Sequence, residues 1–520
     1  MADSTLALQL PARYLRSVNL QRDFADSHLG VRDYQVTPLV VQSTERIMEG
    51  LRPASRTRAF SIIGPYGAGK SAYGVFLAHF LRSDPTVRAK LLATHGMADF
   101  PPTLVEGVTL HPVLVSGNNA SLRVAIVRAL HGSLAGLKLL KHTRLLDTLA
   151  AELDNAEIDP QRVADLVAEA SVLVKDRMSF RGVALVIDEL GQFLDFAARQ
   201  NDERDLFVLQ TLAETAARSD ETPFLLITIL HQSFDRYVAY AGSTRRAEWA
   251  KVQGRFADLP FQEPPVQMLR MVGNALSPAT RDPFAQQREQ WAAVLAQESE
   301  ALGLRPVDLS EKEWQQIVVR AYPLQPLVLV ALPLLFRQLA QNERSLFAFL
   351  TSREPWGLQD VLASTPPGNQ PIYRMPHLYA YVHATLGASL FGRARGQRWA
   401  ELAEARAQIP AGDQVMIDVL TTIGTLGALG QVRGLRASRA LIHFALAGTD
   451  AQAGYSEAAI ERALNELEAR KHITFRQHRD SFVIWEGSDL DLDGLTQNAR
   501  RSVFLSLKRQ SSYAPIYRTT

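Results

Sequence analysis

The sequence of 520 residues contains no cysteine, and this excludes disulfide bonds, cysteine-ligated zinc sites and thiol nucleophiles. The absence also fits a reducing compartment. An excess of one charge is lacking as well, because 56 basic and 54 acidic residues leave a formal net charge of +2. No global basic field therefore indicates nucleic acid, and a nucleic-acid site would have to be local.

Long hydrophobic runs are also missing. The most apolar stretch, "LVLVALPLLF" (327–336), contains Pro333 and is too short to span a bilayer, so it predicts a buried helix. The N-terminus, "MADSTLALQLPARYLRS", has neither the basic segment nor the apolar run of a signal peptide. With 47% apolar residues and a length typical of roughly three or four domains, we expect a soluble, cytoplasmic protein with no membrane partner.

A glycine-rich turn follows the apolar stretch "AFSII" (59–63), which predicts a buried strand. The turn fits G-x-x-x-x-G-K-[ST], the P-loop or Walker A pattern. Its backbone N–H groups surround phosphate at a helix N-terminus, while the lysine reaches the β/γ oxygens and the serine binds Mg²⁺. The alternative is a plain glycine turn. The predicted ATP contacts are Gly64, Pro65, Tyr66, Gly67, Ala68, Gly69, Lys70, Ser71 and Ala72.

A second motif, the Walker B pattern of a buried strand that ends in carboxylates, lies in "GVALVIDELGQFLDF" (182–196). Asp188 at the end of this strand is predicted to support Mg²⁺ together with Ser71. Glu189 is predicted to orient and deprotonate the attacking water, the step that separates hydrolysis from binding. An acidic pair after a strand is weak evidence alone, and its position after a P-loop strengthens it.

Two further strands are predicted, "HPVLVSGNN" (111–119) and "PFLLITIL" (223–230). Four strands with helices between them indicate an α/β fold with a parallel sheet whose C-terminal edge carries the ligand. His231 and Gln232 follow the last of these strands, where such ATPases place a polar group that senses the γ-phosphate. A loop histidine with satisfied hydrogen bonds is the alternative for His231.

Together, "SIIGPYGAGKSAY", "LVIDELGQFLDFAA", "ILHQSFDRYV", "EWAKVQGRFADLPF" and "LAQNERSLFAFL" resemble a group of bacterial ATPases. These are large AAA+-type proteins, related to initiator and STAND ATPases and found in anti-phage defence and mobile gene clusters. The resemblance covers residues 15–490. It implies a P-loop NTPase (AAA+-like) core with a helical lid, a homo-oligomer and an effector protein as a partner.

The resemblance also implies arginines that sense the γ-phosphate. Arg255 in "WAKVQGRF" resembles an arginine finger that acts on a neighbouring protomer, and Arg245 and Arg246 compete for this role. Pairing of Arg255 with Asp258 or Glu263 is the structural alternative.

A second sensor candidate is Arg344, which begins a lid helix in "NERSLFAFL"; the alternative is an exposed helix-capping arginine. One departure from the family concerns the end of the chain, at "SLKRQSSYAPIYRTT", where the resembled proteins continue. We expect a truncated chain or a naturally short member.

The last third of the chain contains a different pattern. In 455–488, Ser456 precedes a helix with apolar positions at 460, 464 and 467, and two short strands flank a polar turn, which is typical of a winged helix. Winged helices bind DNA or protein. The predicted DNA contacts are Arg470, Lys471, Arg476 and Arg479, whereas the alternative is a solvated basic face.

The predicted domains are an N-terminal segment (1–55), an ATPase core (56–264) with a helical insertion (120–181), a helical lid (265–365), a helical region or first winged helix (376–450), a winged helix (451–490) and a tail (491–520). The predicted function is Mg²⁺-dependent ATP hydrolysis that drives assembly or remodelling on DNA within a defence system. The alternative is a nucleotide-switch signalling ATPase whose winged helices bind protein. A metabolic kinase is disfavoured because no phospho-acceptor pocket is visible.

Overall fold

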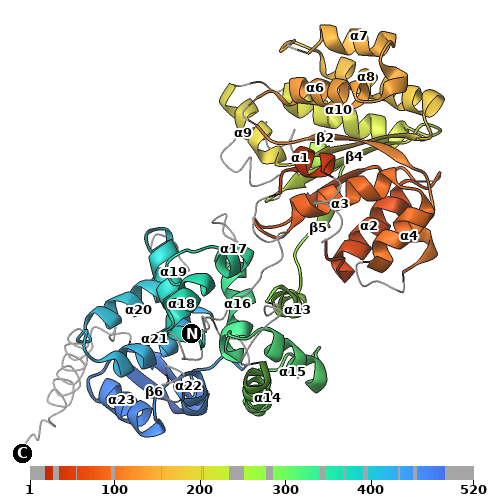
Figure 1. Ribbon diagram of the computed structural model, residues 1–520. Helices are drawn as coiled ribbons and strands as arrows, with labels where there is room; N and C mark the ends of the chain where they lie inside the picture. The colour runs from red at the N-terminus through yellow and green to blue at the C-terminus, as the bar shows by residue number, and fades with distance from the viewer. Residues whose placement is uncertain are drawn as a thin grey trace, which may run out of the picture. The chain divides into compact units, whose positions relative to one another are not determined.

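The computed structural model describes residues 18–26, 34–53, 55–94, 100–118, 120–153, 155–200, 202, 204–232, 251–276, 285–339, 346–366, 371–390, 396–430, 434–448 and 454–485. The chain divides into two compact units, Met1–Tyr373 and Arg374–Thr520. The first unit holds a parallel sheet and a group of helices, and the second is mainly helical (Figure 1).

The sheet has five strands in the order β2-β3-β4-β1-β5, and every neighbouring pair is parallel. β2, β3 and β4 are buried along their whole length and consist mostly of Val, Ile and Leu, as expected where helices cover both faces. The strands are β1 (Ala59–Ile63), β2 (Leu110–Val115), β3 (Gly182–Ile187), β4 (Phe224–Leu230) and β5 (Ala257–Pro260). Because all run in one direction, their carboxyl ends meet at one edge.

Helices cover the two faces of the sheet and form a separate hydrophobic core with each face (Figure 1). One face carries α1 (Leu20–Ala25), α2 (Pro38–Gly50), α3 (Lys70–Arg82), α4 (Pro85–Thr94) and α5 (Pro102–Val105). The opposite face carries α6 (Leu122–Ala135), η2 (Lys138–Leu140), α7 (Arg144–Ala151), α8 (Pro160–Arg177), α9 (Leu190–Gln200) and α10 (Arg204–Arg218).

A group of helices follows the sheet within the first unit: α13 (Pro265–Ala275), α14 (Ala285–Ala301), α15 (Glu311–Arg320), α16 (Pro326–Leu339), α17 (Leu346–Thr351) and α18 (Leu358–Ser364). α16 contacts α13, α14 and α17. It contains Pro333 and is the buried helix that the sequence predicts over 327–336. Among the described residues, no helix combines the length and apolar character needed to cross a bilayer.

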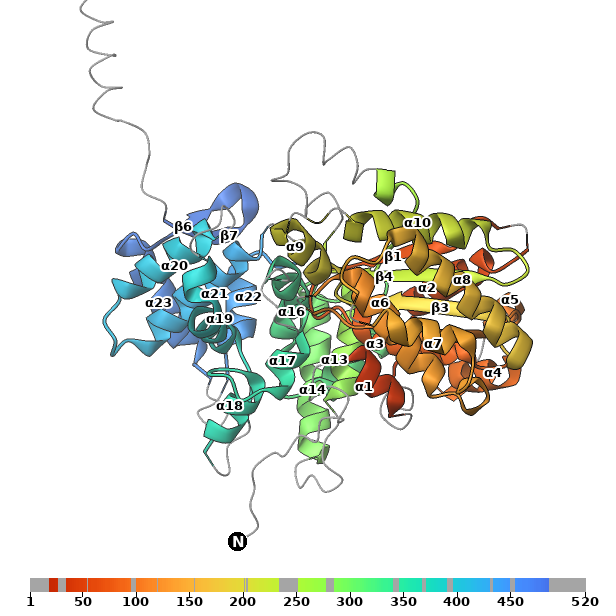
Figure 2. The same ribbon diagram turned by 90° about the horizontal axis from the view of Figure 1, so that it is seen from above.

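The second unit consists of α19 (Met375–Leu390), α20 (Gln397–Ala407), α21 (Gln414–Ala428), α22 (Arg439–Leu446), α23 (Glu457–Ala469), β6 (Ile473–Arg476), η4 (Gln477–Arg479) and β7 (Ser481–Ile484). β6 and β7 form an antiparallel hairpin. α21 is central and contacts α19, α20, α22, α23 and β7 (Figure 2). A β-carbon on Gly424 of α21 would lie 2.3 Å from Leu402 Cδ1, so the missing side chain lets α20 pack closely.

Candidate nucleotide-binding site

The glycine-rich loop connects β1 to α3. Gly67 and Gly69 have φ angles of 72° and 86°, a left-handed conformation that favours glycine. The first helical hydrogen bond of α3 joins the Tyr73 N–H to the Gly69 carbonyl. The N–H groups of Lys70, Ser71 and Ala72 precede it, and such groups at a helix start lack helical partners and suit an anion.

Gly64 begins the loop and fixes its position. Its N–H donates to the carbonyl of Leu230 at the end of β4, at 3.2 Å. A β-carbon on Gly64 would lie 2.0 Å from the carbonyl oxygen of Phe261, which follows β5. Glycine is therefore required here because the loop passes between the ends of β4 and β5.

Lys70 is folded back onto this loop. Its Nζ donates to the carbonyl of Pro65 at 2.7 Å, and the side chain is nearly buried. Burial lowers the pKa of Lys70 to about 8, while the negative charges of Asp188 and Glu189 act in the opposite direction. An anion beside this ammonium would stabilise its charged form.

Asp188 and Ser71, the two predicted metal ligands, are hydrogen-bonded to each other through their side chains. The backbone N–H of Asp188 donates to Val115 at the end of β2, and Asp188 Oδ1 accepts from the Glu189 N–H, both at 2.8 Å. Burial raises the pKa of Asp188, and the hydrogen bonds with Ser71 and the Glu189 N–H and the charge of Lys70 oppose this. The paired hydroxyl and carboxylate oxygens are the donor types that Mg²⁺ prefers.

Glu189 is exposed beside this pair, in a backbone conformation that is unusual for its residue type. Its φ is 50°, and non-glycine residues held in this region cluster at functional sites. Glu189 Oε2 accepts a hydrogen bond from Gln192 Nε2 at 2.8 Å. Gly117, after β2, packs against it, since a β-carbon on Gly117 would lie 2.6 Å from Glu189 Cβ.

His231 and Gln232 follow β4, the strand between β1 and β3. The strand order therefore places them at the same sheet edge as the P-loop and the acidic pair. The imidazole of His231 stacks on the ring of Tyr66, with centroids 4.4 Å apart and an angle of 22° between the planes.

Arg255 lies just before β5 and is bound within its own chain. Its Nη2 and Nε contact Glu214 Oε1 of α10 at 2.7 and 2.9 Å, and its Nη1 donates to the carbonyl of Lys251. The partner is thus Glu214, in place of the Asp258 or Glu263 suggested as the structural alternative. The other finger candidates, Arg245 and Arg246, and the sensor candidate Arg344 lie outside the described residues.

The four predicted DNA contacts lie between the end of α23 and the turn of the β6–β7 hairpin. Arg470 forms an ion pair with Glu466 one helical turn earlier. Lys471, Arg476 and Arg479 are exposed. The structure therefore presents a group of basic side chains along one end of the second unit.

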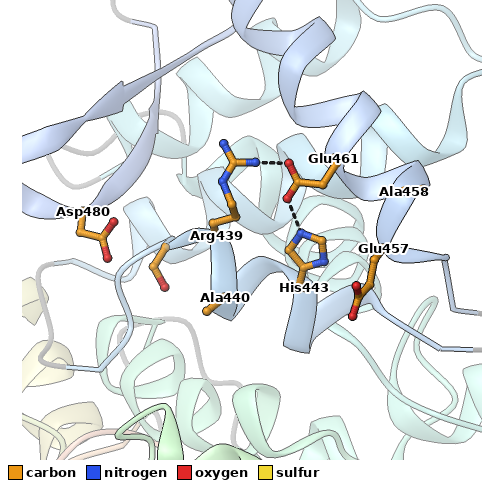
Figure 3. A pocket seen from close by; sticks show the side chains of 8 residues that line it. Arg439, Ala440, His443, Glu457, Ala458, Glu461 and Asp480 are labelled. Atoms are coloured by element: carbon orange, nitrogen blue, oxygen red, sulfur yellow. Dashed lines mark hydrogen bonds and ion pairs between the residues drawn. The ribbon is translucent and has the colours of Figure 1, made fainter.

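A hollow in the second unit is lined mainly by residues of α22 and α23, together with Asp480, which directly follows Arg479 in the hairpin (Figure 3). Arg439 and His443 of α22 both bind the carboxylate of Glu461 on α23, with His443 Nε2 2.6 Å from Glu461 Oε1. The contacts of Arg439 and His443 with Glu461 thus join α22 to α23. The residues that line the hollow include none of the predicted nucleotide contacts.

Sequence reasoning missed Gly117, Gln192 and Glu214, and it gave Tyr66 no role beyond the loop. Gln192 carries a usable signal, because it lies three residues after Glu189 at the start of a helix. Gly117 and Glu214 carry none, because their contacts depend on which strands and helices are neighbours.

The core is a P-loop NTPase core of the AAA+-like type, since β4 lies between the P-loop strand and the acidic strand.

No family model and no curated protein matches the chain. Among solved structures, the chain is similar to the Aeropyrum pernix ORC2 protein in its ADPNP–ADP complexes, with 11% identity, coverage of 94% of this chain and 97% of that chain, and a TM-score of 0.34. It is also similar to the Aeropyrum pernix ORC1 protein in complex with DNA (14%, 88% and 92%, TM-score 0.28) and to Drosophila ORC bound to DNA (11%, 92% and 92%, TM-score 0.27). Similarity at this level establishes neither family nor activity.

Proposed function

We propose that this chain is a Mg²⁺-dependent ATPase that uses ATP for assembly or remodelling on DNA. The observation that carries the proposal is the meeting of Lys70, the Ser71–Asp188 pair and Glu189 at one sheet edge. Lys70 is needed for phosphate binding, the Ser71–Asp188 pair for metal support and Glu189 for water activation.

Each side chain has a separate task in this proposal. Lys70 exchanges the Pro65 carbonyl for phosphate oxygens, and the N–H groups at the start of α3 bind the same anion. Glu189 orients the attacking water and accepts its proton, and Gln192 and Gly117 restrict where its carboxylate lies. Mg²⁺, held by Ser71 and Asp188, would neutralise charge on the phosphates.

Assembly is proposed to involve Arg255. Its guanidinium is held by Glu214 within one chain, so a role on a neighbouring protomer requires exchange of this carboxylate for a γ-phosphate. Arg344 is proposed as a second sensor by the motif resemblance alone. That resemblance is also what supports a place in bacterial defence.

DNA contact is assigned to the second unit, which we propose is a winged helix built from α21, α22, α23 and the β6–β7 hairpin. In this fold the helix before the wing is the one that enters a groove. The exposed charged side chains of α23 are Glu457, Glu466 and Glu468, which repel phosphate, and a single arginine, Arg462, so that acidic groups outnumber basic ones on this helix. The basic residues Lys471, Arg476 and Arg479 are instead at the hairpin. We therefore assign the phosphate contact to the wing.

The second candidate function is a nucleotide switch whose winged helix binds a protein partner. The ion pair of Arg255 with Glu214 favours this function, because a protomer whose Arg255 stays bound to Glu214 cannot offer it to a neighbouring site. Such a protein would bind ATP and hydrolyse it slowly.

Steady-state ATP turnover with and without Mg²⁺ and duplex DNA tests the proposal. Glu189→Gln should bind ATP and lose turnover because an amide cannot take the proton, whereas Lys70→Ala should weaken binding itself. Stimulation by DNA favours the first function, and bound ATP with little turnover in the parent favours the switch. If Glu189→Gln hydrolyses ATP at the parent rate, Glu189 is not the water activator.

A further inference from the structure

The aromatic ring of Tyr66 connects the P-loop to the end of β4. It stacks on His231, and the bond from the Gly64 N–H to the Leu230 carbonyl joins the same two segments one residue before the histidine. A stacked ring pair and a backbone hydrogen bond therefore fix the loop against this strand end.

The same ring also faces the phosphate-binding lysine. Lys70 Nζ lies 5.9 Å from the centroid of Tyr66, within the range of a cation–π contact. Tyr66 thus has the predicted phosphate-binding group and the predicted γ-phosphate sensor as neighbours. The phosphate-binding pattern leaves the side chain at this position open, since the loop binds through backbone N–H groups. Phosphate binding by the loop therefore does not explain the aromatic ring at position 66.

We propose that Tyr66 is a positioning residue that holds the His231 imidazole in one orientation beside the phosphate site. This inference rests on the proposed ATPase function. Stacking on Tyr66 favours one of the staggered rotamers of the His231 side chain, and the fraction of sites that are productive rises with the population of that rotamer. The loss is expected in turnover and not in binding, because Lys70 and the loop N–H groups remain.

The first measurement compares kcat with the Kd for a non-hydrolysable ATP analogue in Tyr66→Ala, Tyr66→Leu and Tyr66→Phe. Removal of the ring should lower kcat about three- to tenfold, the worth of an aromatic pair, while Kd changes by less than about threefold. Tyr66→Phe keeps the ring and should restore most of the lost kcat. Phe207→Ala removes a 55% exposed aromatic side chain from α10 and serves as the matched control.

The second measurement is a double-mutant cycle with His231→Ala. If Tyr66 acts through His231, Tyr66→Ala should lower kcat little further in a chain that already carries His231→Ala. An equal loss in both backgrounds, a parent-like kcat in His231→Ala, or a loss confined to Kd overturns the inference. Tyr66→Leu, which keeps most of the side-chain volume, repeats the cycle if Tyr66→Ala fails to fold. A parent without Mg²⁺-dependent turnover overturns the proposed function as well, whereas turnover with additive losses overturns this inference alone.

Discussion

Gly117 and Glu189 are in contact at the sheet edge, so close that a β-carbon on Gly117 would lie 2.6 Å from Glu189 Cβ and 2.9 Å from its carbonyl oxygen. Gly117 follows β2 and Glu189 follows β3, and these strands are neighbours. The proposed water activator therefore has its position set by a glycine about seventy residues earlier in the chain.

Gly117→Ala tests this contact. The methyl group must displace Glu189, and a general base moved by about 1 Å can lose roughly a hundredfold in rate. We expect kcat to fall 10- to 100-fold, with the affinity for ATP unchanged, because the P-loop is not involved. Gly132→Ala on α6, where nothing lies within 4 Å of an added β-carbon, is the matched control. A parent-like kcat in Gly117→Ala would show that Glu189 tolerates displacement or has no catalytic part.

Much of the sheet edge follows from local sequence. The strand predicted over 59–63 is β1, and the acidic pair lies directly after β3 as predicted. These features can be predicted because buried parallel strands are short apolar runs that end in recognisable motifs.

The side-chain contacts of the site could not be predicted without knowledge of the strand order. Tyr66 meets His231 because β1 and β4 are neighbours, and Glu214 meets Arg255 because α10 packs beside the segment before β5. One sequence carries no signal for such pairings, since each side chain is also compatible with a solvated loop or helix face.

The lowered pKa of Lys70 predicts a pH dependence of ATP binding. In the free site Lys70 loses its proton as the pH rises through about 8, whereas phosphate charge holds the proton on and raises the pKa in the complex. ATP binding should therefore take up a proton above pH 8, and affinity should fall with rising pH there. Calorimetry at pH 8.5 in two buffers of different ionisation enthalpy measures the uptake. Lys70→Arg should abolish it because arginine stays charged, and an uptake of zero in the parent contradicts the assignment.

The ion pair between Arg255 and Glu214 predicts that assembly is restrained by an intramolecular contact. Glu214→Gln removes the competing charge, so ATP should promote oligomers at a lower protein concentration, with little change in folding stability because the pair is partly exposed. Glu300→Gln weakens the Arg305 pair, which has similar exposure, and is the control. Sedimentation velocity with a non-hydrolysable ATP analogue measures the shift.

Arg255→Ala completes this test. It should lose turnover and keep nucleotide affinity, and mixing it with Glu189→Gln should restore activity at junctions that pair the intact halves. If mixed oligomers form and no activity returns, Arg255 acts within its own subunit or has no role in hydrolysis.

The basic hairpin of the second unit decides between the two proposed functions. Arg476 ends β6, Arg479 ends η4 within the turn before β7, and both are exposed. Arg470 is engaged by Glu466, and the exposed charged side chains of α23 are three glutamates and one arginine, Arg462. Contacts to a phosphate backbone give affinity with little sequence information, and each lost contact lowers the salt slope by about one unit. Replacement of Arg476 and Arg479 by Glu should therefore weaken binding to duplexes of unrelated sequence alike and lower the salt slope by about two. Basal ATP turnover should stay unchanged.

The control for this variant replaces two other arginines by Glu and makes the same change in charge. These are Arg177 and Arg181, both exposed in the first unit. Titration of labelled duplex at several salt concentrations distinguishes the outcomes. Unchanged affinity in the hairpin variant, or no binding by the parent at low salt, would assign the second unit to a protein partner and favour the nucleotide switch.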